Sequence, residues 1–207
     1  MGMRASINYF FEWVTVLAWI NFLWVVFTLL GFLVFGWAPA TVAMLKVFSE
    51  IYREKNIQQP IFKTFYAQYK VSFLKANAIG IMLVLVILSM AYGLLTLPYL
   101  NDLAFYLLFG FYLIMFSLVT FIILFIFPVL TQYKLSFLNS IKYSMLVGLS
   151  NLHYSVGIVI SMGIIYALFR AFPGLLLFFA VSIPSAILMK LALKVFDRVG
   201  MQTEMAK

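Results

Sequence analysis

The sequence predicts an all-α fold, a polytopic bundle of membrane-spanning helices. Of its 207 residues, 66% are apolar and only 10% are charged, whereas about 25% of a soluble domain is charged. The apolar residues form continuous runs that are long enough to cross a bilayer core of roughly 30 Å as helices. They do not alternate with polar residues as β-barrel strands do. These observations exclude a soluble globular enzyme and a disordered chain.

Five apolar runs predict five spanning helices in a single integral membrane domain, residues 1–207. The runs cover 14–35, 78–97, 104–127, 144–169 and 175–193. Trp13 and Trp37 flank the first run, as expected at the two membrane interfaces. Pro98 and Pro128 are expected to end the second and third runs, and Pro184 to bend the fifth, because proline lacks a backbone donor.

Two amphipathic helices are predicted on the cytoplasmic side, at 42–55 and 61–75. In the first, Met44 and Phe48 share one face of a helical wheel, and Lys46 and Glu50 share the other. In the second, the apolar and aromatic residues share one arc with lysines beside it. That pattern fits a helix in the membrane interface, and it fits equally well a helix packed on the protein's own spans.

The distribution of Lys and Arg predicts the orientation of the chain in a plasma membrane. Residues 37–77 hold six Lys and Arg, whereas residues 98–103 hold none. Because basic loops stay in the cytoplasm, five spans place the N-terminus outside and the C-terminus inside. The net charge of +8 is then explained by topology and contact with anionic lipid headgroups, and no nucleic-acid partner is expected.

One seven-residue segment occurs twice, each time just before a predicted span. Residues 68–74 read Gln-Tyr-Lys-Val-Ser-Phe-Leu and residues 132–138 read Gln-Tyr-Lys-Leu-Ser-Phe-Leu. One interpretation is that both copies merely anchor a helix at the headgroups. The other is that they form a joint docking surface for a partner, through Gln68, Tyr69, Lys70, Gln132, Tyr133 and Lys134.

Several motifs together resemble the YesL family of bacterial membrane proteins. The first span closes on a turn containing Pro39, Ala40 and Thr41, and the segments 60–65 and 73–77 follow at the family's spacing. The family commonly has Gly before this proline, where the present chain has Ala38. The family has no established catalytic activity. The resemblance implies a sugar-uptake context, in which the permease or ATPase subunits of a carbohydrate ABC importer are the expected partners.

The residues themselves offer little catalytic chemistry. The chain has one His and no Cys, and none of its six Asp and Glu residues lies inside a predicted span. No acid–base pair, metal centre or cofactor is therefore expected. The leading function is therefore a non-enzymatic accessory subunit or adaptor of the importer. The alternative is an independent channel or carrier for a small neutral solute.

The polar and small residues inside the spans predict contacts between helices. Asn21 needs a partner, because a buried amide cannot be left unpaired in lipid. On the fourth span, Gly157 and Ser161 are four residues apart, as are Gly163 and Ala167. That spacing lets another helix approach closely, and packing within this chain is the expected use of these four residues.

Overall fold

The structure, a computed structural model, describes residues 3–57 and 59–200, and for residues 3–6 only the backbone. The far C-terminus, expected in the cytoplasm, lies outside the described residues. The regular structure of the described chain is all helical, in the order α1 (Met3–Leu30), α2 (Trp37–Glu54), α3 (Ile61–Thr96), a 3-10 turn (Leu97–Tyr99), α4 (Asp102–Gln132), α5 (Phe137–Ser150), α6 (Leu152–Ala171), α7 (Leu175–Phe179) and α8 (Ser182–Val199). This confirms the predicted all-α fold.

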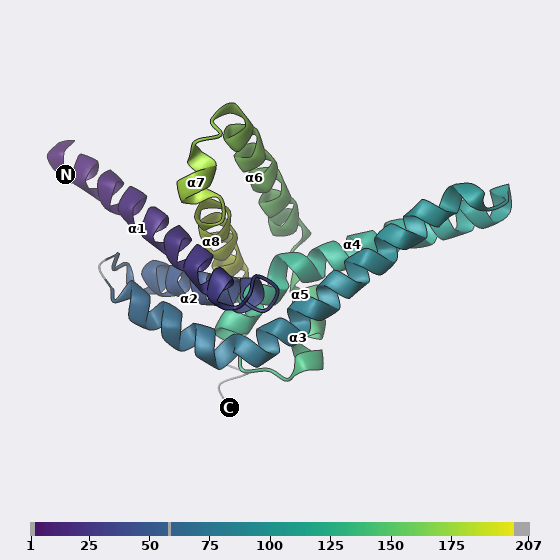
Figure 1. Ribbon diagram of the computed structural model, residues 1–207, viewed down its shortest axis with the longest axis horizontal. Coiled ribbons are helices and arrows are strands. Elements are labelled where there is room, and N and C mark those ends of the chain that lie inside the picture. The colour runs from purple at the N-terminus through teal and green to yellow at the C-terminus, as the bar shows by residue number, and fades with distance from the viewer. Residues whose placement is uncertain (1–2, 58, 201–207) are drawn as a thin grey trace.

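The helices are arranged as three hairpins, which spread from a common body (Figure 1). In the first, α2 returns along α1, so that Trp13 stacks on Tyr52 with ring centroids 5.9 Å apart. In the second, α3 and α4 run out together as a long arm. In the third, α6 runs outward and α7 and α8 return, so that His153 Nε2 lies 3.1 Å from Arg198 Nη1. These two contacts thus hold the helices of the first and third hairpins together toward their open ends.

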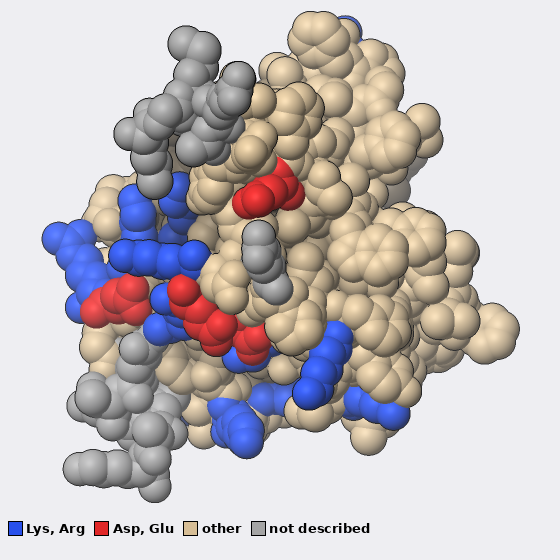
Figure 2. Space-filling model, turned by 90° about the vertical axis from the view of Figure 1, so that its left-hand side faces the viewer, with Lys and Arg blue, Asp and Glu red and all other residues tan. Residues whose placement is uncertain are grey.

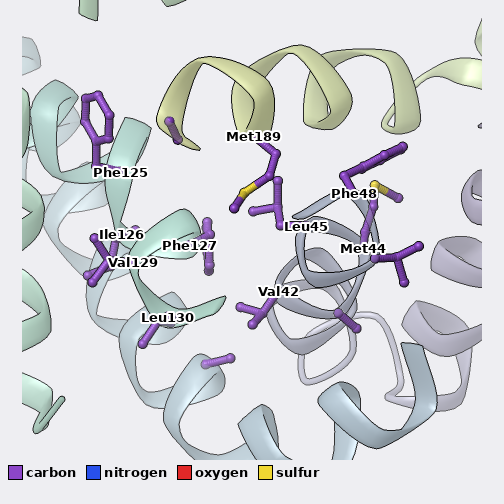
Figure 3. Packing of buried hydrophobic residues seen from close by; sticks show 14 of the residues in the cluster. Val42, Met44, Leu45, Phe48, Phe125, Ile126, Phe127, Val129, Leu130 and Met189 are labelled. Carbon is purple, nitrogen blue, oxygen red and sulfur yellow. The ribbon is translucent and has the colours of Figure 1, made fainter. Parts of the chain in front are cut away.

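The hydrophobic core is built around α2. Nearly all of its apolar side chains are buried, because α1, α3, α4 and α8 surround it. Leu45 of α2, Phe127 of α4 and Met189 of α8 converge in this core (Figure 3). The charged face of α2 carries Lys46 and Glu50, which form an ion pair at 3.4 Å. The sequence therefore predicted the two faces of this helix, while the structure makes it the centre of the body.

Local signals account for several helix ends. Asn101 caps α4 through Oδ1, which accepts from the Ala104 backbone N–H at 2.9 Å. Ser136 caps α5 in the same way, accepting from the Asn139 N–H at 3.4 Å. Lys55 ends α2 in the left-handed conformation, with φ of 52°.

The predicted spans differ from the observed helices in five places. The first span, expected to reach residue 35, ends at Leu30, and residues 31–36 form turns before α2. The segment 61–75 and the second span form one continuous helix, α3. The third span does not end at Pro128, since α4 continues through it to Gln132. The fourth span is divided at Asn151 into α5 and α6. The fifth is divided at residues 180–181 into α7 and α8, and Pro184 lies in the first turn of α8, where its missing N–H is tolerated.

Four helices among the described residues are long and apolar enough to cross a membrane: Ile7–Leu30, Ile61–Tyr99, Asp102–Gln132 and Leu152–Ala171. The exposed apolar surface of the α3–α4 arm, including Leu95 and Tyr106, agrees with contact with lipid. The first part of α3 packs on the protein's own helices through the buried Phe65, which contacts Phe27 of α1. Its neighbours Phe62 and Tyr66 remain about half exposed.

Candidate docking site

The two copies of the repeated segment meet at one groove. This groove, of about 570 Å³, lies between α3 and the connection from α4 to α5. The first copy contributes Gln68, Val71 and Ser72, and the second contributes Gln132 through Leu135. Lys46 of α2 and Lys75 of α3 complete the basic lining. Segments 64 residues apart in the sequence thus form one surface, here called the repeat groove.

The second copy is held firmly against the core. Gln132 donates from Nε2 to Ser49 Oγ of α2 at 2.8 Å and to Thr131 Oγ1 at 3.0 Å. The Tyr133 ring packs edge-on against Phe196 of α8, with centroids 5.5 Å apart. Burial raises the pKa of Tyr133 to about 12, with smaller opposing effects from Arg53, which lowers it, and Asp197, which raises it. Lys134 is exposed at the edge of the groove.

The first copy is turned so that only part of it faces the groove. Tyr69 points toward α1, where its hydroxyl donates to the Phe27 carbonyl at 3.2 Å. Lys70 is exposed, and its Nζ lies 4.3 Å above the centre of the Tyr66 ring. Of the six predicted docking residues, four therefore line the groove, while Tyr69 and Lys70 lie outside it.

Two lysines of the groove were not part of the predicted docking set. Lys46 was placed on the polar face of a separate amphipathic helix, and Lys75 was counted toward membrane topology and within the family-like segment 73–77. The Lys75 ammonium donates to the Leu135 carbonyl, which ties α3 to the α4–α5 connection. Their position follows from the crossing of α2, α3 and α4, which no local sequence pattern shows.

The Figure 2 view shows most of the visible Lys and Arg gathered over one part of the surface, with Asp and Glu among them, while most of the remainder is uncharged. Some of these charges are paired, as in the 3.8 Å contact between Arg53 Nη2 and Asp197 Oδ1. The charge segregation agrees with a protein whose uncharged part is embedded in a bilayer.

Asn21 has a partner, as its burial in an apolar span required, and the partner is the break between α7 and α8. Its Nδ2 donates to the Leu177 carbonyl at 3.3 Å, and its Oδ1 accepts from the Val181 N–H at 3.1 Å. In an unbroken helix these two backbone groups would bond to each other. The side-chain amide of Asn21 is therefore inserted into the hydrogen-bond ladder and satisfies both groups.

Among residues 3–57 and 59–200, no helix packs against the predicted small-residue face of the fourth span. A Cβ added at Gly157 or Gly163 would have no heavy atom within 4 Å. Ser161 bonds back to its own helix, at 2.7 Å to the Gly157 carbonyl, and Ala167 is exposed. The close contact is instead at Gly148 of α5, where an added Cβ would lie 2.7 Å from the Phe121 Cβ.

The turn motif of the first hairpin has a defined structural role. Pro39, Ala40 and Thr41 lie in the first turns of α2, and Pro39 and Ala40 are buried. Thr41 Oγ1 accepts from Trp24 Nε1 at 3.0 Å and donates to the Trp37 carbonyl at 2.7 Å. Gly80 of α3 leaves room for Ala38, since an added Cβ would lie 2.9 Å from the Ala38 side chain. The motif thus locks α1, α2 and α3 together.

Fold and surface together define a multi-pass α-helical membrane protein. Residues 17–94 match a family model described as "Protein of unknown function, DUF624". Three uncharacterised proteins of Bacillus subtilis (strain 168) are similar over nearly the whole chain. YesV is 33% identical over 94% of this chain and 93% of its own, and YteU is 31% identical over 92% and 85%. YesL is 28% identical over 98% and 95%. No solved structure matches. The chain belongs to the YesL-like family.

Proposed function

We propose that this protein is a non-enzymatic accessory subunit of a carbohydrate ABC importer and docks onto a permease or ATPase subunit. The main support for this proposal is that both repeat copies, from separate helices, form one groove with exposed lysines beside it. Duplicated residues brought together on one surface are better explained by a shared partner than by two independent membrane anchors.

Electrostatic attraction between exposed lysines of this protein and the partner is expected at the edge of the proposed interface. Lys134 is exposed on one edge of the repeat groove, and Lys70 is exposed on the outer side of α3. Exposed charges of one sign steer a partner of the opposite sign and set the association rate more than the stability of the complex. The partner surface is therefore expected to be acidic.

The chemistry of the described acids supports a binding role. Glu50 pairs with Lys46 and accepts from Thr64 Oγ1 at 3.0 Å, so it is committed to holding α2 and α3 together. Asp197 pairs with Arg53 between α8 and α2. These carboxylates join helices and do not converge on a common cavity.

The alternative, an independent carrier, would need polar side chains that converge on a path through the bundle. Ser117 and Thr120 of α4 donate to backbone carbonyls of their own helix, at 3.0 and 2.8 Å. Asn21 is committed to the α7–α8 break. These bonds favour the adaptor over the carrier.

We further propose that the basic surface faces the cytoplasm in a plasma membrane, with both ends of the described chain on that side. The Trp13–Tyr52 stack brings the third turn of α1 beside the last turn of α2. Asn8 and Glu12 line one cavity together with Ile57 and Gln59. Residues so close cannot lie on opposite sides of a bilayer core of roughly 30 Å. This proposal replaces the external N-terminus expected from charge alone.

Affinity purification from native membranes tests the adaptor. A tagged copy is extracted in mild detergent, and its partners are identified by mass spectrometry. The adaptor predicts importer subunits in stoichiometric amounts. Recovery without them, together with sugar movement into vesicles that hold only this protein, would replace the adaptor with the carrier.

A further inference from the structure

The repeat groove carries more positive charge than its own residues neutralise. Three lysines line it, Lys46, Lys75 and Lys134. Only Lys46 has a carboxylate partner, Glu50; among the described residues neither Lys75 nor Lys134 forms an ion pair. Lys75 is also partly withdrawn from water, between α3 and the α4–α5 connection. A cation removed from water without a counterion is costly, so the groove is suited to receive an anion.

The uncharged lining supplies one further donor group, the Gln68 amide of the first copy. The Gln132 amide and the Ser72 hydroxyl also line the groove, but they already donate within the protein, to Ser49 and Thr131 and to the Gln68 carbonyl. A phosphate group offers several acceptor oxygens and one to two negative charges, so it can bind the ammonium groups and the Gln68 amide at once. A single carboxylate could satisfy fewer of them.

We propose that the repeat groove binds a phosphate group, with Lys75 and Lys134 as its main cationic contacts. The site goes beyond the adaptor function, and only its depth in the bilayer rests on the orientation proposed above. The groove lies where α4 ends and the polar connection begins, which is the depth of lipid phosphates in the proposed orientation. The phosphate belongs either to an anionic lipid headgroup or to a free phosphorylated solute, and the recognising chemistry is the same.

The test measures ligand-dependent thermal stability of the full chain purified in uncharged detergent. One arm adds short-chain phosphatidylglycerol, another adds inorganic phosphate, and a third adds potassium chloride at matched ionic strength. Binding to the folded state raises the melting temperature, because the added stability grows as the logarithm of one plus the ratio of ligand concentration to Kd. The groove predicts stabilisation above the chloride arm. Response to the lipid alone assigns a headgroup, and response to inorganic phosphate shows that a free phosphate suffices.

Matched variants locate the site. Lys75→Gln removes the recessed charge, and the ligand concentration needed for a given rise in melting temperature should increase about tenfold or more, as for a lost charged hydrogen bond. Lys63→Gln makes the same change at an exposed position of α3 outside the groove. It should change the required ligand concentration less than about twofold, by charge screening alone. Lys134→Gln, at the exposed edge, replaces Lys75→Gln if that variant does not fold.

Two results would overturn the proposal. The first is a wild-type protein that neither phosphate source stabilises beyond chloride. The second is an equal loss of ligand-dependent stabilisation in Lys63→Gln and in the groove variants. That result would show only a general attraction of anions to a basic protein.

Discussion

Asn21 should be the span residue whose replacement damages the third hairpin most. Replacing it with Leu keeps the branched shape and the number of heavy atoms, and removes both hydrogen bonds to the α7–α8 break. Two bonds at about 0.5–1.5 kcal/mol each give a loss of about 1–3 kcal/mol. The Val181 N–H can partly recover by closing onto the Leu177 carbonyl, which would straighten the break. The expected net destabilisation is therefore about 1–2 kcal/mol.

The assay is thermal or denaturant unfolding in detergent, with Asn8→Leu as the control. Asn8 lies on the same helix and is exposed, so the same chemical change there should alter stability by less than about 0.5 kcal/mol. Combining Asn21→Leu with Pro184→Ala should recover part of the loss, because Ala restores a backbone donor to the first turn of α8. Equal stability of Asn21→Leu and the wild type would refute the proposed insertion into the ladder.

Three further predictions concern packing, ionisation and the first hairpin. Gly148→Leu should destabilise by about 1–3 kcal/mol through overpacking against Phe121, whereas Gly157→Leu should melt like the wild type; the reverse order in a melting experiment would contradict the observed α4–α5 contact. The raised pKa of Tyr133 predicts that stability is fully present below about pH 10 and is lost as pH rises toward about 12, where the unfolded chain has already released its proton. Tyr133→Phe should flatten this decline, and an unchanged pH profile would count against burial of the phenol. Thr41→Val should cost about 1–2 kcal/mol, since Trp24 Nε1 loses its acceptor, and equal melting temperatures for Thr41→Val and the wild type would show that the bond contributes nothing.

The sequence was informative where a property belongs to one helix. The amphipathic pattern of 42–55 predicted which face of α2 is buried, because burial there follows the helical period. The pattern of 61–75 could not show that the helix continues to Thr96, since amphipathic and apolar stretches can share one helix. Pro128 was a misleading signal because the surrounding core, including Phe127 and Val129, keeps α4 helical beyond it.

Features made by two distant segments could not be read from either segment alone. The break at residues 180–181 contains Ala and Val, which give no sign of a break, and its partner Asn21 is 160 residues away from Val181. The contact glycine was expected at Gly157, yet only the position of Phe121 makes Gly148 the tight one. Similarly, the repeat was visible in the sequence, but the lysines that complete its groove come from the crossing of three helices.

Charge reversal at the two exposed lysines tests the central claim, that the repeat copies form a joint docking surface. The variant Lys70→Glu with Lys134→Glu is expressed in native membranes beside a matched Lys63→Glu control. Cysteines introduced at Asp102 and Lys55, and labelled with a membrane-impermeant thiol reagent, verify that the orientation is unchanged. The account predicts that association with importer subunits slows by roughly tenfold or more, so that co-purification and sugar uptake fall in the double variant and not in the control. Undiminished co-purification and uptake with correct orientation would contradict it and leave both segments as headgroup anchors.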